Sequence, residues 1–303
     1  MKGTIMKNKR IILTIVFIII SILIAVCITI AIIKVKEENA RIDAEAVTLK
    51  DNFLSEVIFR IDFTTILELT GNQKEAAAKF RNRIIPQFPN LEIIKQQKVN
   101  FNINPNGISK DKQDYDGLCW IFRDDLSSKQ VSLTANNLIL NYHKNAYLGF
   151  KSFLTEILLL ISALKEYNHF QITFLGLRYI NEITEERVNE NISEYINPTL
   201  FNNRIIDDLE NNNEKLIQTL SRLDFQKEDY YLTLQYGFFN PTIDYKYKKH
   251  FILDYDCVSK KRLSIDDVFE NLKNMNKYIF EKFEYSISDK FIDKMGEEYE
   301  SNG

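Results

Sequence analysis

The feature that most constrains this chain is an unbroken apolar run from Ile11 to Ile33, which contains no charged residue, no Gly and no Pro. As a helix this run would be about 34 Å long, enough to cross a hydrocarbon core of about 30 Å. A lone span must satisfy its backbone N–H and C=O groups internally, so only a helix suits it. We therefore expect a transmembrane helix over residues 11–33, preceded by a basic flank over residues 1–10.

A buried core helix and a cleaved signal peptide are the alternatives. Core helices are seldom apolar on every side over this length. A signal peptide usually has an apolar region of about 7–15 residues that ends at a small-residue site, whereas Lys34–Glu38 follow this longer run. Residues 24–27 resemble a lipoprotein cleavage box, but Val26 is bulky where that box needs a small residue. We expect the run to be retained and the lipid bilayer to be its partner.

The side of the membrane is set by Lys and Arg near the two ends of the span. The count favours, by a narrow margin, a cytoplasmic amino terminus and a domain outside the cell. The charged residues 34–52 then predict a helical stalk. Val35, Ile42 and Leu49 fall seven residues apart, so a short coiled coil is the alternative, but two heptads are too few to establish one.

Beyond the stalk, the composition is that of an ordinary folded domain. The formal net charge is −3, which argues against a nucleic-acid partner because such proteins carry a basic surface. Cys119 and Cys257 follow no disulfide or metal-binding spacing, so we expect both in the core, with a pairing left open. His143, His169 and His250 have no metal-binding spacing either.

Alternation of apolar and polar residues predicts a series of strands. They cover residues 57–63, 91–103, 118–123, 130–135, 138–143, 171–183, 230–238 and 250–258. Residues 104–117 hold Pro, Gly and several Asp and predict an exposed loop. Short strands joined by tight turns indicate an antiparallel sheet.

Helices are predicted where apolar residues recur at three- and four-residue steps, over residues 74–85, 149–167 and 264–295. Ser264 and Asp267 have the spacing of a capping box at the start of the last of these helices. Residues 202–223 are acidic and Asn-rich, and we expect a helix there as well. We expect an α+β fold over residues 53–296, an antiparallel sheet with helices packed on one side, and a disordered tail over residues 297–303.

The segment Leu175–Ile183, with its Gly-Leu-Arg-Tyr-Ile-Asn motif, resembles a sporadically distributed family of uncharacterised prokaryotic proteins. Further similar segments are residues 57–63, 133–142, 149–153, 195–198, 253–256 and 283–289. The resemblance covers about residues 50–296 and implies a domain boundary but no established activity. The chain departs from the family at Met275–Lys277, where the family has Leu-His-Glu, and in carrying an anchor.

The candidate ligand-binding residues are Arg178, Asp254 and Asp256. Asp254 and Asp256 lie on the same face of the strand over 250–258, where they could hold a divalent cation or accept hydrogen bonds from Arg178. Arg178 shares its strand face with apolar residues, so a bidentate carboxylate partner would satisfy it, and we expect Asp254 or Asp256 in that role. An exposed or ion-paired strand face is the simpler interpretation of all three.

The sequence carries none of the familiar catalytic or phosphate-binding motifs. We expect no catalytic residue, no cofactor and no metal ligand. Residues 245–249 alternate Tyr with Lys, and we interpret them as a solvated hairpin rather than a surface for nucleic acid or lipid headgroups. The leading hypothesis is a non-catalytic membrane-anchored domain that binds a protein or a small molecule. The alternative is a metal-dependent enzyme built on Arg178, Asp254 and Asp256, with Glu182 nearby.

Overall fold

The described part of the chain is built on a nine-stranded antiparallel sheet in the order β3-β4-β5-β6-β2-β7-β10-β9-β8. Its strands are β2 (Leu54–Phe63), β3 (Asn90–Asn104), β4 (Gly107–Arg123), β5 (Lys129–Leu133), β6 (Asn137–His143), β7 (Ile172–Thr184), β8 (Ser221–Lys227), β9 (Tyr230–Phe239) and β10 (His250–Ser259). The helices are α2 (Ala78–Ile84), α3 (Phe150–Leu164), α4 (Glu185–Val188), α6 (Val268–Ser286) and α7 (Asp289–Met295). The α+β prediction is confirmed.

The computed structural model describes residues 48–49, 53–71, 73–104, 107–143, 146–167, 170–188, 191–200, 218–239, 250–295 and 297–298. At residues 48–49, 96–104, 107–116, 185–186, 239 and 297–298 it describes the backbone alone. The chain divides after Val47, and every described residue belongs to the second unit. The predicted span over residues 11–33 lies outside the described residues. Within the described ranges, no helix has both the length and the apolar character that a bilayer crossing requires.

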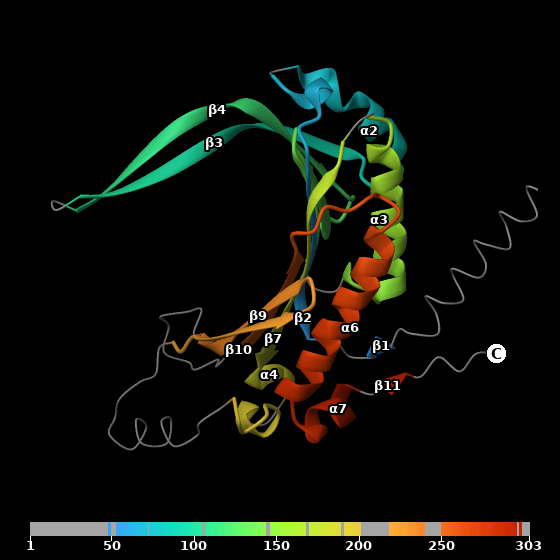
Figure 1. The fold of residues 1–303 in the computed structure, drawn as a ribbon. Helices are drawn as coiled ribbons and strands as arrows, with labels where there is room; N and C mark the ends of the chain where they lie inside the picture. The colour runs from blue at the N-terminus through green and yellow to red at the C-terminus, as the bar shows by residue number, and fades with distance from the viewer. Residues whose placement is uncertain are drawn as a thin grey trace, which may run out of the picture. The chain divides into compact units, whose positions relative to one another are not determined.

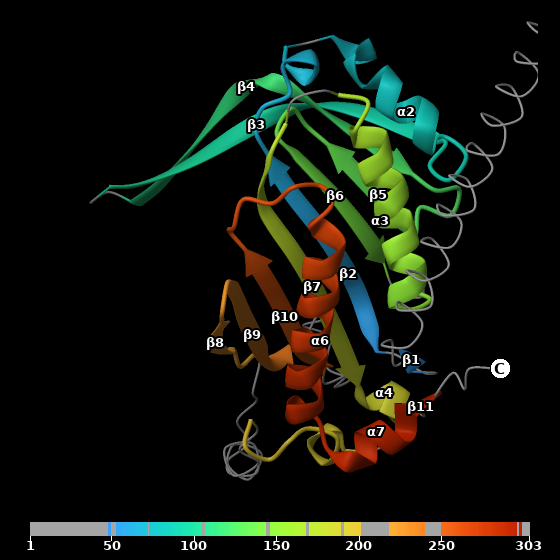
Figure 2. The ribbon, with the colours of Figure 1, turned by 45° about the vertical axis from the view of Figure 1, so that its right-hand side comes forward.

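The helices α2, α3 and α6 lie on the same side of the sheet (Figures 1 and 2). Strand β2 shows why, because Val57, Phe59 and Ile61 are buried while the residues between them face the other way. The apolar stripes of α3 and α6 close over this apolar face. Tyr142 of β6 meets Phe153 of α3 with ring centroids 5.0 Å apart, and Tyr255 of β10 meets Phe283 of α6 at 6.2 Å.

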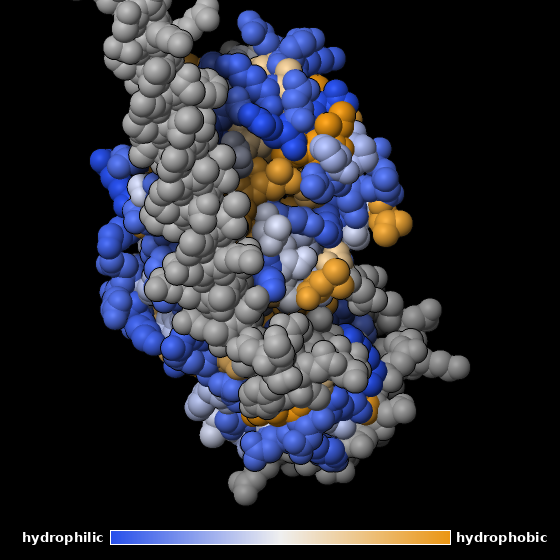
Figure 3. All heavy atoms as spheres, turned by 90° about the vertical axis from the view of Figure 1, so that its right-hand side faces the viewer, coloured by the Kyte–Doolittle hydropathy of each residue, from blue (hydrophilic) through white to orange (hydrophobic). Residues whose placement is uncertain are grey.

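The surface on the helix side is ordinary for a folded domain. Where described residues are visible there, most of the surface is hydrophilic and the apolar side chains show as separate small areas (Figure 3). Exposed large apolar residues such as Leu67, Leu126 and Leu158 come from distant parts of the described chain. Scattered apolar residues of this kind are normal and do not mark a contact surface.

The predicted loop over residues 104–117 is wrong at Asn104 and from Gly107 onward, and residues 105–106 lie outside the described ranges. Strands β3 and β4 continue their pairing to Asn104↔Gly107 and form a long two-stranded arm. The arm leaves the sheet on the side away from the helices (Figures 1 and 2). Gly and Asp signal turns in isolation, but partner backbone groups along the whole length of β3 favour the extended form.

Three other boundaries differ from the prediction. The helix assigned to residues 202–223 is wrong at its carboxyl end, because β8 begins at Ser221, while residues 201–217 lie outside the described ranges. The short strands β1 (Thr48–Leu49) and β11 (Glu297–Glu298) pair with each other. This pairing departs from the predicted stalk and from the predicted disordered tail at those residues.

The last predicted helix is two helices, α6 and α7. Ile287 between them is extended and forms an antiparallel bridge with Ile196. The N–H of Ser288 donates to the carbonyl of Tyr195 at 3.0 Å, so a distant segment takes backbone groups that a continuous helix would use itself. The predicted contact between Ser264 and Asp267 is present, with Ser264 N donating to Asp267 Oδ2 at 3.1 Å and Asp267 N donating to Ser264 Oγ at 3.3 Å. This turn precedes α6 instead of opening it.

Candidate functional site

The face of the sheet that turns away from α3 and α6 carries the predicted site residues, and no described helix covers it. We call it the open face. Its central side chains are Arg60 and Asp62 of β2, Arg178 of β7, Asp254 and Asp256 of β10, Thr233 of β9, and Arg222 and Asp224 of β8. Strands that are far apart in sequence therefore contribute to one polar surface.

Arg178 and Asp254 form the bidentate pair that the sequence predicts. Arg178 Nε donates to Asp254 Oδ1 at 2.8 Å, and Arg178 Nη2 donates to Asp254 Oδ2 at 2.6 Å. The two residues lie diagonally across the β7–β10 ladder, since Arg178 is directly opposite Asp256. The hydrogen bonds to Asp254 raise the pKa of the Arg178 guanidinium further above its ordinary value. Both oxygens of Asp254 are therefore occupied by Arg178.

Asp256 is the carboxylate that remains. It is half-buried between Arg178 on β7 and Thr233 on β9. Within the described chain it takes part in no hydrogen bond and no ion pair. Burial raises the pKa of the Asp256 carboxyl above its ordinary value, against the lowering attraction of Arg178. A cation that comes close to Asp256 would stabilise its charged form and offset the cost of its burial.

The other arginines of the open face are already bound to carboxylates. Arg60 makes two hydrogen bonds of 2.8 Å to Asp62. Arg222 Nε lies 3.0 Å from each oxygen of Asp224, and Thr233 Oγ1 donates to Asp224 Oδ1 at 2.7 Å. These arginines attract Asp256 over a distance, but their donors are directed at other acids.

Gly176 of the family-like motif has a clear packing role. An ideal Cβ at this position would lie 3.0 Å from the ring of Phe174, so the ring covers the glycine backbone. The guanidinium of Arg60 in turn lies over that ring, 5.2 Å from its centroid. Phe174 and Asp62 together hold Arg60 in place beside the centre of the open face.

Glu182, which we placed near the site, lies toward the end of β7. Its Oε1 is 2.5 Å from Nδ1 of His250, the first residue of β10. His143, the last residue of β6, is 3.8 Å from Glu56 in the same manner. Both histidines therefore meet carboxylates at strand ends, while His169 lies outside the described residues.

Tyr179 of the same motif points into the core. Its hydroxyl donates to Asn276 Oδ1 of α6 at 2.8 Å and lies 3.2 Å from the hydroxyl of Tyr147. Asn276 of the last long helix therefore contacts the Gly-Leu-Arg-Tyr-Ile-Asn motif through Tyr179. Burial raises the pKa of Tyr179 well above its ordinary value, which keeps the phenol neutral.

Of the two cysteines, Cys257 is buried as predicted and Cys119 is half-buried, and both are free thiols. Burial raises the pKa of the Cys257 thiol to about 12, so it is inert at neutral pH.

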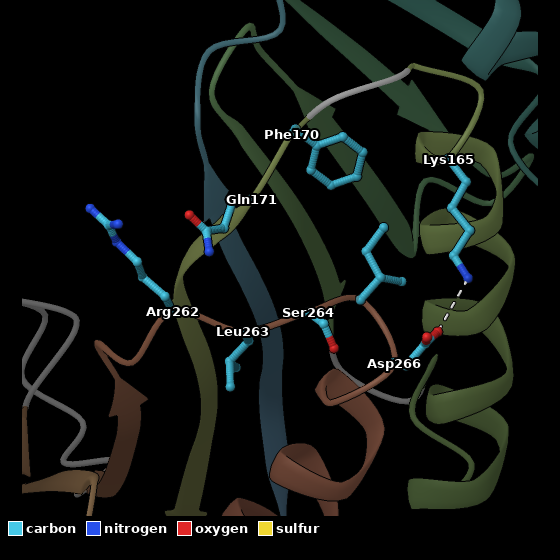
Figure 4. Close-up of a pocket in the computed structure, with 8 residues that line it drawn as sticks. Lys165, Phe170, Gln171, Arg262, Leu263, Ser264 and Asp266 are labelled. Atoms are coloured by element: carbon cyan, nitrogen blue, oxygen red, sulfur yellow. Dashed lines mark ion pairs between the residues drawn. The ribbon is translucent and has the colours of Figure 1, made fainter.

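A shallow groove of about 640 Å³ lies at one end of the sheet, where the segment before α6 crosses the start of β7. Lys165 and Asp266 pair across it at 3.6 Å, and Arg262 points away from both (Figure 4). Leu263 N donates to the carbonyl of Ile172 at 3.0 Å, which ties this crossing to the sheet. The Lys165 and Asp266 side chains are largely exposed and the lining polar groups do not converge, so we place the candidate site on the open face.

The sequence missed the part that Arg60, Arg222 and Thr233 play in this surface. The alternation in β2 shows that Arg60 leaves the core, but the order of the strands is what brings it near Asp256. A comparison with models of known protein families and a comparison with curated proteins each found no match for this chain. The family resemblance therefore stays a prediction.

Proposed function

We propose that this chain is a single-pass membrane protein whose α+β domain binds a partner through the open face, with Arg178, Asp254 and Asp256 at the centre of the contact. The apolar run over residues 11–33 supports the anchor. The basic residues around that run favour a domain outside the cell. The helices on one face of the sheet support the choice of the other face as the binding surface (Figure 2).

The observation that carries the binding proposal is the state of Asp256. It is a half-buried carboxylate next to a fully engaged Arg178–Asp254 pair. A cationic group from outside, such as an Arg or Lys side chain of a partner protein, would pair with it and displace no existing bond. Thr233 lies directly opposite Asp256 on β9, and Ile180 lies opposite Asp254 on β7, so both would border such a contact.

Site-specific photocrosslinking of the full chain in living cells tests this proposal. A photoreactive residue at position 233 or 180 is expected to give an adduct of discrete mass. The matched control is the same residue at Glu284, an exposed position on α6. The change Asp256→Asn should remove the adduct from positions 233 and 180. The proposal is contradicted if position 284 gives as much adduct as positions 233 and 180. It is also contradicted if the adduct persists in the Asp256→Asn variant.

The metal-dependent enzyme is the second hypothesis, and the geometry favours it less. Arg178 occupies both oxygens of Asp254, which a cation would need. Among the described side chains, no group of three or more His, Cys, Asp or Glu residues is arranged to hold a metal. Thermal unfolding with Mg²⁺, Mn²⁺ or Zn²⁺ tests it. A metal-dependent rise in the midpoint that Asp254→Ala with Asp256→Ala removes would restore this hypothesis.

A further inference from the structure

Strand β8 is the last strand of the sheet, and among the described residues only β9 pairs with it. In an antiparallel ladder, successive residues turn their backbone groups toward opposite neighbours. Thr219, just before β8, donates its N–H to the carbonyl of Phe238 at 3.0 Å. The odd-numbered residues of β8 therefore bond toward β9. The backbone groups of Arg222, Asp224 and Gln226 point to the outer edge.

Two of the common protections against edge pairing, a proline and a β-bulge, are missing from the described strand β8. Residues 221–227 contain no Pro, and the β8–β9 register runs without a bulge. Arg222 and Asp224 are exposed, with 59% and 61% of their side-chain surfaces accessible. Their mutual pair and the hydroxyl of Thr233 hold both side chains along the strand. The edge thus offers backbone groups together with an ordered positive and negative charge.

The charges are complementary to a second copy of the same strand in one register only. With Leu223 opposite the second copy's Leu223, each Arg222 lies opposite an Asp224. Shifting the two strands to the next allowed register places Asp224 opposite Asp224 in one direction, and Arg222 opposite Arg222 in the other. Like charges directly opposite each other destabilise a ladder, so the charge pattern selects the first register.

We propose that two copies of this chain pair antiparallel through β8, with Leu223 on the two-fold axis. The interface is isologous, because each copy contributes the same edge. The backbone groups of Arg222 and Asp224 form the new ladder, and the two sheets continue into one. The pairing uses the outer backbone edge of β8, and it does not require a partner to bind at Asp256.

Self-crosslinking of the full chain in its native membranes tests the register. Leu223→Cys places two thiols directly opposite each other in a non-hydrogen-bonded pair, where Cβ atoms are about 4.5 Å apart, at the upper end of the range for a disulfide. We expect a disulfide-linked dimer on a non-reducing gel. The matched control is Ser221→Cys, since Ser221 would face the second copy's Phe225. The unaltered chain controls for its own cysteines. The proposal fails if Leu223→Cys gives no dimer or if Ser221→Cys gives as much.

A charge exchange separates pairing from folding. Arg222→Asp and Asp224→Arg each place like charges opposite each other, so each variant alone should lose about five- to thirtyfold in pairing. Co-expressed with different tags, the two variants have complementary edges and should copurify as a mixed pair. If Arg222 and Asp224 acted only within one copy of the chain, combining the two variants would not restore pairing. Unchanged pairing of either variant alone, or no mixed pair, would overturn the proposal.

Discussion

At the scale of single residues, the open face shows how one strand can satisfy an arginine and leave a neighbouring acid unpaired. Asp254 is only 8% exposed, whereas 39% of the Arg178 side chain is accessible. Solvent screening reduces what this pair contributes to stability. Removing one partner still leaves a charge in a partly buried position, which costs more than the pair gains.

A double-mutant cycle on this pair should show coupling. We expect Arg178→Met and Asp254→Leu each to lower the free energy of unfolding by about 1–3 kcal/mol, toward the low end because Arg178 is partly exposed. The double variant should lose less than the sum, since it leaves no unpaired charge. Urea denaturation measures all three. The exposed pair Lys79–Glu68 is the control, and additive losses at Arg178 and Asp254 would contradict coupling.

Asp256 gives a prediction for pH. Its pKa is raised by burial, so between its ordinary pKa of 3.8 and the raised value the folded state binds more protons than the unfolded state. Stability from this group therefore falls as pH rises through that window. We expect Asp256→Asn to be more stable than the unaltered chain at neutral pH, with the difference vanishing once the solution is more acidic than the ordinary pKa.

Urea denaturation at neutral and acidic pH measures this difference. A stabilised Asp256→Asn variant that also loses the photocrosslinked adduct would mark Asp256 as a residue kept for binding at a cost in stability. A destabilised variant at neutral pH would mean that Arg178 and its neighbours stabilise the charge more than burial opposes it.

At the scale of elements, the arm formed by β3 and β4 is the least expected feature. Beyond the irregular register near Lys95, residues 97–104 pair only with residues 107–114 among the described strands. Only Trp120–Arg123 of β4 reach β5. The outer arm therefore contributes little to the sheet, and the main core forms without it.

Shortening this arm tests its independence. Replacing residues 98–113 with Asn-Gly would close the hairpin after Gln97↔Asp114 with a favoured two-residue turn. We expect the free energy of unfolding, measured by urea denaturation, to change by less than about 1 kcal/mol, because changes outside the core usually have small effects. The control is Phe283→Ala on α6, which should cost about 3–5 kcal/mol because it opens a cavity. A similar loss for both would show that the arm belongs to the core.

At the scale of the whole molecule, the chain divides at Val47 into an amino-terminal unit and the α+β unit. This division agrees with a domain that folds independently of the segment before it. It also makes the proposed anchor testable without disturbing the sheet.

Membrane attachment should follow residues 11–33. We expect the full chain to stay with membranes after extraction with alkaline carbonate, because a spanning helix resists that treatment. A chain that begins at Thr48 should appear in the supernatant with the same circular dichroism melting curve as a detergent-solubilised full chain. Release of the full chain by carbonate would refute the anchor.

The sequence by itself predicted most of the strands and helices of the described fold, although it did not predict β8. The period-two pattern in β2, β7 and β10 separated the residues that face the helices from Arg178, Asp254 and Asp256, which lie on the opposite face. It could propose that Arg178 binds a neighbouring carboxylate because an apolar strand face leaves a guanidinium few other partners. Such inferences succeed because alternation is a local property of a half-buried strand.

The tertiary structure decided the rest. Strand order and register chose Asp254 over Asp256 as the partner of Arg178, and brought Arg60 and Arg222 to the same face. Pairing with β3 made a strand of a segment rich in turn residues, and the bridge from Ile196 divided the last helix at Ile287. In each case the deciding hydrogen bonds come from a different segment of the chain, and the pattern within one segment does not predict them.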